Sequence, residues 1–396
     1  MKRTLASLDG LRLDGQRALV RVDFNVPLKD GAVSDDTRIR ASLPTIRYLR
    51  EKGARVVLLS HLGRPKGGPD PRYSLKPVVR ALERALGAPV AWLERPDTDE
   101  AVAFTRRMSR GSVALAENTR FFPGEEENDA GLGRRFAALG DFYVEDAFGS
   151  AHRAHASTEA VAHVLKPAVA GYLLERELQY LGSALHNPKR PFLAVLGGAK
   201  VSGKIDLIEN LLPRVDRILV GGAMACTFFK AMGLEVGRSL VEDDRLEVAR
   251  GLMGKAGDKL VLPTGCVVAP DLVEAVTSMS VPRNRIPGGF AVYDIDPMTA
   301  RTYTQWILEG GTVLWNGPVG VFETPPFDAG TRSIAQAMAE ATGRGAVTIV
   351  GGGDSAAAVS ALGWSDRFTH ISTGGGAALE FLEGKVLPGV AALDDA

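Results

Sequence analysis

The sequence predicts an α/β fold with parallel sheets, divided between two domains. Short runs rich in valine, isoleucine and leucine recur along the chain, and stretches with helical spacing separate them. Continuous apolar runs are typical of strands buried on both faces of a parallel sheet, and their alternation with helices indicates the α/β class. The chain has 396 residues, which favours two domains because one domain usually has about 100–200 residues.

The first half of the chain places polar side chains directly after its expected strands. These strands, at 18–22, 56–59, 113–116 and 142–144, lead into Asp23-Phe24-Asn25, Ser60-His61-Leu62-Gly63-Arg64, Glu117-Asn118-Thr119-Arg120 and Glu145-Asp146. Ligands of open α/β sheets bind beyond the carboxyl ends of the strands. Because arginine offers paired donors for phosphate and carboxylate, we expect an anion site built from Arg38, His61, Arg64, Arg120 and Arg153. Asp23 and Asn25 add acceptors for hydroxyl groups.

The second half places glycine after its expected strands. These strands, at 192–196, 218–220, 313–315, 347–350 and 370–372, lead into Gly197-Gly198, Gly221-Gly222, Asn316-Gly317, Gly351-Gly352-Gly353 and Thr373-Gly374-Gly375-Gly376. Glycine lets the backbone approach a ligand closely. The last two runs precede expected helices, whose free N–H groups attract phosphate. We therefore predict a second site, built from backbone, for another ligand or another part of one reaction.

Two lysines follow the first of these glycine turns. Residues 198–205 nearly match the P-loop pattern GxxxxGK[ST], but Ile205 stands where a Mg²⁺-binding hydroxyl is required, which argues against a P-loop kinase. Lys200 and Lys204 would share a helix face if a helix has begun there. Two exposed lysines without a role are the alternative.

Asp354 is the candidate metal ligand. Asp354 and Ser355 follow three glycines at an expected helix start, and either residue suits the N-cap. An aspartate beside phosphate needs a cation between them, and Mg²⁺ fits because it prefers oxygen ligands. A plain N-cap is the alternative. His152 and His155 form an HxxH pair without a third ligand at a usual metal-site spacing, so we expect structural histidines there.

A leucine stripe predicts the connection between the two halves. Leu174, Leu178, Leu181 and Leu185 lie on one face of an expected helix that ends before Pro188. We interpret it as a helix that connects two domains, with an ordinary surface helix as the alternative.

Charge, apolar runs and cysteine content limit the partners and the cellular location that we expect. Lys+Arg and Asp+Glu both number 47, so the formal net charge is zero, and neither nucleic acid nor a membrane is an expected partner. The N-terminal stretch lacks the apolar core of a signal peptide, and no apolar run reaches a membrane-spanning length, so we expect a cytoplasmic protein. Cys226 and Cys266 form no CxxC pair and are expected to be buried.

Eight segments, in order, resemble the motifs of phosphoglycerate kinases. They are Val22-Asp23-Phe24-Asn25-Val26-Pro27, Ser60-His61-Leu62-Gly63-Arg64-Pro65, Ala151-His152-Arg153-Ala154-His155-Ala156-Ser157, Gly197-Gly198-Ala199-Lys200-Val201, Gly221-Gly222-Ala223-Met224-Ala225, Trp315-Asn316-Gly317-Pro318, residues 351–358 and residues 373–377. The resemblance runs from about residue 5 to about residue 388. The chain departs from the family pattern at Gly203, where Asp is usual, and at Thr119, where Leu is usual.

The resemblance implies two Rossmann-like three-layer domains, each with a mostly parallel sheet, that are joined by a helix and face each other across a cleft. It implies an N-terminal 3-phosphoglycerate-binding domain over residues 1–171, the connecting helix over 172–186, and a C-terminal nucleotide-binding domain over 187–385. Residues 386–396 are expected to return to the N-terminal domain. Family habit implies a monomer whose domains close by hinge bending.

The resemblance also implies a function: a glycolytic kinase that moves a phosphoryl group reversibly between 1,3-bisphosphoglycerate and ADP with Mg²⁺. The implied substrate-binding residues are Asp23, Phe24, Asn25, Arg38, His61, Leu62, Gly63, Arg64, Arg120 and Arg153. The implied catalytic residues are Arg38, Lys200, Lys204, Gly374 and Gly375. The implied nucleotide-binding residues are Lys204, Gly289, Glu323, Gly352, Gly353, Asp354 and Ser355, with Asp354 as the metal ligand. A nucleotide-binding protein without activity on the same fold is the alternative.

Overall fold

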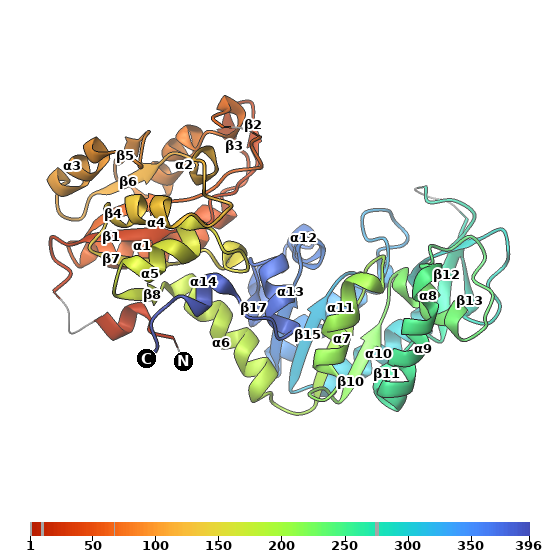
Figure 1. Cartoon of the computed structure of the whole chain (residues 1–396). Coiled ribbons are helices and arrows are strands. Elements are labelled where there is room, and N and C mark those ends of the chain that lie inside the picture. Colours follow the sequence, from red (N-terminus) through yellow and green to blue (C-terminus); the bar gives the residue numbers. More distant parts are fainter. Residues whose placement is uncertain (1, 9–11, 67, 274–276) are drawn as a thin grey trace. The chain divides into compact units, whose positions relative to one another are not determined.

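The computed structural model describes residues 2–8, 12–66, 68–273 and 277–396. The chain divides into two compact units, one formed by Met1–Gln179 with Val386–Ala396 and the other by Tyr180–Lys385. Each unit contains a six-stranded sheet with helices around it (Figure 1). All neighbouring strands in both six-stranded sheets are parallel. The predicted α/β class with two parallel sheets is confirmed.

The sheet of the first unit has the strand order β5-β6-β4-β1-β7-β8. Its strands are β1 (Arg17–Arg21), β4 (Arg55–Leu59), β5 (Val90–Leu93), β6 (Val113–Ala116), β7 (Phe142–Glu145) and β8 (Ala168–Ala170), and a small hairpin is formed by β2 (Leu28–Lys29) and β3 (Ala32–Val33). The chain places β4 on one side of β1 and later places β7 on the other side. The carboxyl end of β1 therefore lies at a topological switch point, where α/β sheets bind ligands.

Helices complete the first unit. They are α1 (Thr37–Glu51), α2 (Lys76–Leu86), α3 (Asp99–Arg107), α4 (Ala130–Ala137) and α5 (Val161–Val164). The apolar sides of α1 and α2 bury Ile46, Leu49 and Leu82 in one cluster with Val20 and Val56 of the sheet. This packing fixes the start of α1 near the carboxyl end of β1.

The second unit has a parallel sheet in the order β11-β10-β9-β15-β16-β17 and a separate three-stranded antiparallel sheet in the order β13-β12-β14. Its strands are β9 (Phe192–Leu196), β10 (Arg217–Val220), β11 (Leu260–Val261), β12 (Gly265–Ala269), β13 (Met279–Pro282), β14 (Ala291–Ile295), β15 (Thr312–Asn316), β16 (Val347–Gly351) and β17 (His370–Ile371). Its helices are α7 (Ile205–Leu211), α8 (Met224–Ala231), α9 (Leu246–Ala256), α10 (Pro297–Glu309), α11 (Ala329–Gly343), α12 (Gly353–Ala361) and α13 (Gly376–Leu382). Trp315, fully buried, packs in a cluster with Ile307 of α10 and Ile334 of α11.

The helix expected at 172–186 forms as α6 (Tyr172–His186). Its first turn is attached to the first unit, because the N–H groups of Leu173 and Leu174 donate to Oδ1 of Asp146 at 2.9 and 3.4 Å. The C-terminal segment, which includes α14 (Pro388–Ala391), belongs to the same unit. Lys166 pairs with Asp394 at 2.6 Å, and the two chain ends lie side by side (Figure 1).

Candidate functional site

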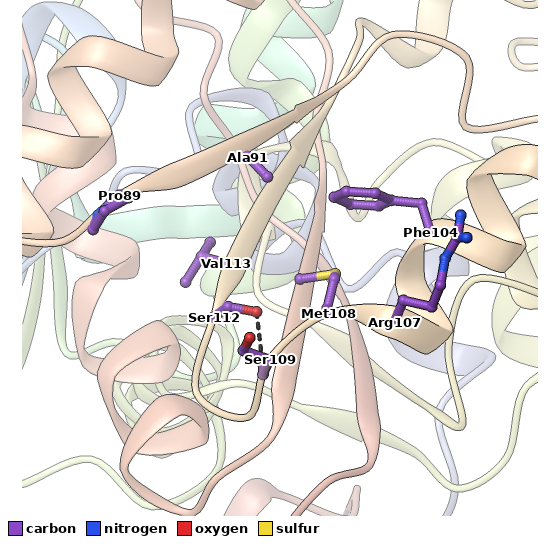
Figure 2. Close-up of a pocket in the computed structure, with 8 residues that line it drawn as sticks. All are labelled: Pro89, Ala91, Phe104, Arg107, Met108, Ser109, Ser112 and Val113. Carbon is purple, nitrogen blue, oxygen red and sulfur yellow. Dashed lines mark hydrogen bonds between the residues drawn. The ribbon is translucent and has the colours of Figure 1, made fainter.

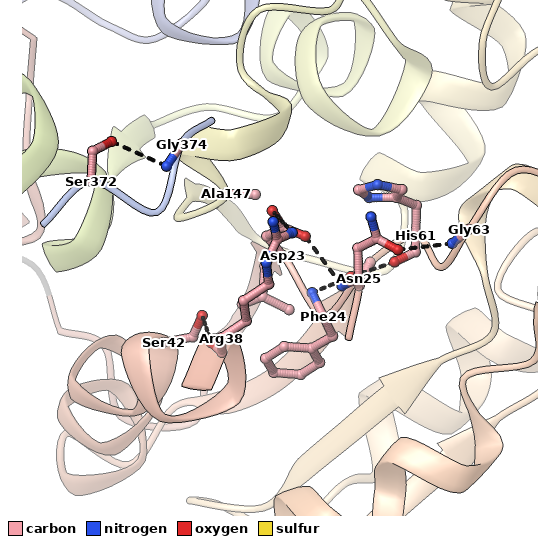
Figure 3. A network of polar contacts seen from close by, with 12 residues as sticks. Asp23, Phe24, Asn25, Arg38, Ser42, His61, Gly63, Ala147, Ser372 and Gly374 are labelled. Carbon is pink, nitrogen blue, oxygen red and sulfur yellow. Dashed lines mark hydrogen bonds and ion pairs between the residues drawn. The ribbon is translucent and has the colours of Figure 1, made fainter. Parts of the chain in front are cut away.

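The loops that follow β1 and β4 in the first unit are joined by hydrogen bonds. Phe24 N–H donates to Oγ of Ser60 at 2.8 Å, and Gly63 N–H donates to Oδ1 of Asn25 at 2.9 Å (Figure 3). Four of the predicted substrate residues therefore belong to one connected loop pair: Phe24, Asn25, Leu62 and Gly63.

Arg38 lies in the first turn of α1 and points back to the end of β1. Its Nη1 is 2.7 Å from Oδ2 of Asp23, which is largely buried, while the Arg38 side chain keeps 37% of its surface exposed. Asp23 in turn accepts from the N–H of Asn25 at 3.1 Å. The ion pair orients the guanidinium and leaves donors free for an anionic ligand.

His61 is a buried neutral imidazole. Burial lowers the pKa of His61 well below its usual range, and the charges of Arg21, Arg120, Arg38 and His155 lower it further. Nη2 of Arg21 lies 3.2 Å from Nδ1 of His61. A guanidinium only donates, so Nδ1 accepts and the ring proton is on Nε2. His61 is thus prepared to donate a hydrogen bond to a carboxylate or phosphate oxygen.

The remaining predicted cations differ in how firmly they are held. Arg120 donates from Nη1 to the carbonyl of Gly63 at 2.6 Å and pairs with Glu126 at 3.3 Å. Arg153 is half-buried and has its Nε 3.2 Å from Nε2 of His152, whereas Arg64 is exposed. Arg120 is therefore attached to the loop after β4, whereas the Arg64 side chain is open to solvent.

Arg21 is a site residue that the sequence analysis missed. It is fully buried at the end of β1, and its Nε donates to Oγ of Ser157 at 2.9 Å. Ser157 donates in turn to Oε1 of Glu125 at 2.5 Å, so a carboxylate is connected to the buried cation through one hydroxyl. The signal was present in the sequence, because an arginine inside an apolar run of a central strand needs a polar partner.

His155 of the HxxH pair is buried. Burial lowers the pKa of His155 to about 3, helped by the charges of Arg21, Arg120 and Arg153, and its backbone N–H donates to Oγ1 of Thr158 at 3.1 Å. Across the described ranges of the chain, no three His, Cys, Asp or Glu side chains are grouped to hold a metal ion.

In the second unit, the condition under which Lys200 and Lys204 would share a helix face is not met, because α7 has not begun at Lys200. Residues Ser202–Lys204 form a 3₁₀ turn and α7 begins only at Ile205, so Lys200 lies ahead of the helix and is exposed. Lys204 is half-buried and donates from Nζ to Oδ1 of Asn316 at the end of β15. Burial lowers the pKa of Lys204, and the charges of Glu383 and Asp354 oppose that shift.

The N-cap expected at Asp354 or Ser355 is wrong. The N-cap of α12 is Gly352, whose φ is 89°, and both residues lie inside the first turn. Ser355 is buried, and its Oγ accepts from the N–H of Gly317 at 2.7 Å. Asp354 is exposed, so the two neighbours divide two tasks: Ser355 connects the ends of β15 and β16, and the Asp354 carboxylate faces solvent.

The glycines after the strands serve two purposes. A Cβ on Gly197 would lie 2.0 Å from the carbonyl oxygen of Pro318, and one on Gly222 would lie 2.5 Å from that of Gly198. Gly197 and Gly222 are therefore required because neighbouring loops pack closely against each other there. The sequence analysis had explained these glycines by the close approach of a ligand. A Cβ on Gly353 or Gly375 would meet only open space. Helix α13 begins at Gly376, as the glycine run predicts.

Comparison with known proteins decides the family. A model of the phosphoglycerate kinase family matches residues 8–385. The chain belongs to the phosphoglycerate kinase family. It is 56% identical to a phosphoglycerate kinase of Chloroflexus aurantiacus over 100% of this chain and 99% of the relative, and 52% identical to that of Nostoc punctiforme over 100% of both chains.

Solved structures agree with this assignment. The structure of phosphoglycerate kinase from Coxiella burnetii has a TM-score of 0.90 and 42% identity, and covers 99% of this chain and 98% of that one. The enzyme from Pyrococcus horikoshii has a TM-score of 0.84 and 31% identity, with the same coverage. None of the described helices has both the length and the apolar character needed to cross a bilayer.

A pocket of about 300 Å³ in the first unit lies apart from the candidate site residues of that unit. It is lined by Pro89, Ala91, Phe104, Arg107, Met108, Ser109, Ser112 and Val113 (Figure 2). Pro89 and Ser112 precede β5 and β6, so the pocket lies at the amino ends of these strands. Asp23 and His61 follow the carboxyl ends of β1 and β4, at the opposite edge of the same sheet.

Proposed function

We propose that the chain catalyses the reversible, Mg²⁺-dependent transfer of a phosphoryl group between 1,3-bisphosphoglycerate and ADP, which gives 3-phosphoglycerate and ATP. The chain is a member of the phosphoglycerate kinase family. The observation that carries the proposal is that the carboxyl ends of its two parallel sheets carry different chemical groups. One end has Arg38, His61 and Arg120 for an anionic acid. The other has Lys204, glycines with open space around them, and the exposed carboxylate of Asp354.

The acid substrate is assigned to the first unit. Arg38, Arg64, Arg120 and Arg153 supply charge to the carboxylate and phosphate groups, and Nε2 of His61 donates a neutral hydrogen bond. Asp23 and Asn25 accept hydrogen bonds from the hydroxyl group of the substrate. Phe24 in the loop after β1, with Leu62 and Gly63 in the loop after β4, shapes the site. The Asp23–Arg38 pair keeps both groups oriented before the substrate arrives.

The nucleotide is assigned to the second unit. Lys204 contacts the phosphates, and Gly352, Gly353 and Ser355 form the start of α12, where free N–H groups attract phosphate. Asp354 fits as a single carboxylate ligand for Mg²⁺, because Mg²⁺ at nucleotides takes one or two carboxylates together with phosphate oxygens and water. Glu323 and Gly289, both exposed, are assigned to the ribose and the base.

Transfer from an acyl phosphate requires positioning and charge neutralisation more than acid–base chemistry. The leaving carboxylate needs no proton, so a site rich in cations suffices. Arg38 and Lys200 balance the charge of the in-line transition state, and Lys204 with the backbone at Gly374 and Gly375 assists. Asp354 would hold Mg²⁺, which when bound would supply positive charge to the nucleotide phosphates. Because the two ligands are held by different units, we also propose that hinge bending at α6 and at residues 386–396 brings donor and acceptor into line.

Phosphoryl transfer from ATP to 3-phosphoglycerate, coupled to NADH oxidation, tests the reaction. We expect turnover that requires both substrates and Mg²⁺. Turnover with other phosphate acceptors but none with 3-phosphoglycerate would contradict the proposed substrate.

Replacing Asp354 with asparagine is expected to raise the Mg²⁺ concentration for half-maximal activity by roughly tenfold or more, because one charged ligand is lost. The KM for 3-phosphoglycerate should stay unchanged. The matched control is Asp366→Asn, which removes the same charge from an exposed position in the 3₁₀ turn after α12 and should behave as wild type. An unchanged Mg²⁺ requirement in Asp354→Asn would exclude Asp354 as the metal ligand.

A further inference from the structure

Asp294, at the end of β14, is a buried carboxylate with no role in the reaction assigned so far. Only 2% of its surface is exposed. Its Oδ1 accepts from the N–H of Ile295 at 2.8 Å, and its Oδ2 accepts from the N–H of Gly330 at 2.7 Å. Gly330 lies in the first turn of α11, whose own N-cap, Asp328, makes no side-chain capping bond. Asp294 therefore caps α11 from another element.

Two positions next to the Asp294 carboxyl group must be glycine. A Cβ on Gly320 would lie 2.2 Å from Oδ1 of Asp294, and one on Gly330 would lie 2.3 Å from the same atom. Real atoms cannot approach that closely, so glycine is required at both positions. Gly320 and Gly330 lie on either side of Glu323, which is carried by the segment 317–328 that leads from β15 to α11.

Other contacts also attach the segment 317–328 to β14 and to α11. Val321 N–H donates to the carbonyl of Tyr293 at 2.9 Å, and the rings of Tyr293 and Phe327 lie 4.9 Å apart. Oγ1 of Thr331 accepts from the N–H groups of Val319 and Gly320 at 3.2 and 3.3 Å. The segment is thus held on both sides of Glu323, while Glu323 itself is exposed.

We propose that Asp294 is a positioning residue for the nucleotide ribose, because it fixes the start of α11 and with it the segment that presents Glu323. This inference rests on the proposed function, which assigns the ribose to Glu323. A carboxylate on a mobile segment would lose the orientation that a hydrogen bond to the two ribose hydroxyls requires.

The test is equilibrium binding of ADP and of 2′,3′-dideoxy-ADP, each with Mg²⁺, to wild type and to Asp294→Asn. The amide keeps the size of the side chain but turns a donor toward one of the two backbone N–H groups. Wild type should prefer ADP by about tenfold, the effect of roughly one charged hydrogen bond, and Asp294→Asn should lose most of that preference while its affinity for the dideoxy nucleotide stays within about twofold.

Two further variants make the result specific. Asp328→Asn removes a charge from the same helix end, where Asp328 pairs with Arg332 at 2.5 Å on the surface, and should keep the full ribose preference. Thr331→Val removes the second attachment of the segment and should weaken the preference in the same direction, which keeps the test valid if Asp294→Asn does not fold.

The outcomes separate this inference from the proposed function. If wild type turns over 3-phosphoglycerate, and Asp294→Asn and Thr331→Val keep the ribose preference or lose affinity for both nucleotides equally, the inference is wrong and the proposed function stands. If wild type is inactive but the preference is present and falls in Asp294→Asn, the inference stands and the proposed reaction fails.

Discussion

Replacing Arg38 with alanine is expected to lower kcat by roughly 100- to 1000-fold, the usual cost of removing one oriented donor from a developing negative charge. The physical reason is twofold. The guanidinium that balances the transition state is lost, and the Asp23 carboxylate, 2.7 Å from it in wild type, keeps its negative charge beside an anionic substrate. The measurement is the coupled assay with both substrates at saturating concentration.

Arg40→Ala is the matched control for this prediction. Arg40 lies two residues further along α1 and pairs on the surface with Asp36 at 2.8 Å, so its loss should change kcat by less than about threefold. An Arg38→Ala variant as active as Arg40→Ala would show that the proposed charge balance is wrong even if the reaction is right.

Replacing Asp146 with asparagine is expected to remove a large pH dependence of stability. Asp146 is fully buried and caps the first turn of α6 through Oδ1, while its Oδ2 has no hydrogen-bond partner among the described residues. Burial raises the pKa of Asp146 to about 8, against the opposing effects of the nearby Thr45 hydroxyl and of the N–H groups of Leu173 and Leu174. The native state therefore favours the protonated acid, which asparagine mimics.

The number of protons bound in the native and unfolded states decides whether stability rises or falls with pH. Between about pH 4 and pH 8 the unfolded chain has lost the proton that the native state still holds, so this group destabilises the native state by about 1.4 kcal/mol more for each pH unit. The penalty is absent below the unfolded pKa and complete above the native one. The free energy of unfolding of Asp146→Asn, relative to wild type, should therefore rise from pH 5 to pH 8 and then level off.

Urea unfolding of both proteins at a series of pH values measures this difference. Asp141→Asn is the control, because hydrogen bonds from Arg17 lower the pKa of Asp141 in spite of the burial that raises it. The group is ionised in both states above pH 5, so the difference between Asp141→Asn and wild type should be flat over that range. A flat difference for Asp146→Asn as well would mean that Asp146 is ionised in the native protein.

The sequence predicted the strand ends well because a buried parallel strand is a run of apolar residues that stops where polar or glycine residues begin. The strand expected at 192–196 forms as Phe192–Leu196, and that at 113–116 as Val113–Ala116. The three-stranded sheet of β12, β13 and β14 was not predicted, because β13 spans only Met279–Pro282 and is mostly exposed.

Tertiary contacts explain the site features that the sequence analysis missed. Nothing local shows that Arg21 meets His61, forty residues away, or that Asp294 caps a helix thirty-six residues later. The spacing of Lys200 and Lys204 left open whether a helix had begun there, and the chain forms a 3₁₀ turn over Ser202–Lys204 before α7 begins at Ile205. Local patterns predict elements, and the side chains that connect elements distant in sequence require the folded structure.

The measurement that tests the central claim most directly is equilibrium binding of 3-phosphoglycerate and of MgADP, each alone, to wild type, Arg38→Ala and Lys204→Ala. The claim is that the first unit holds the acid and the second holds the nucleotide. We expect Arg38→Ala to lose affinity for 3-phosphoglycerate and keep its affinity for MgADP, and Lys204→Ala to do the reverse. If either variant loses both ligands equally while it stays folded, or if the two losses are exchanged, the division of the site between the two units is contradicted.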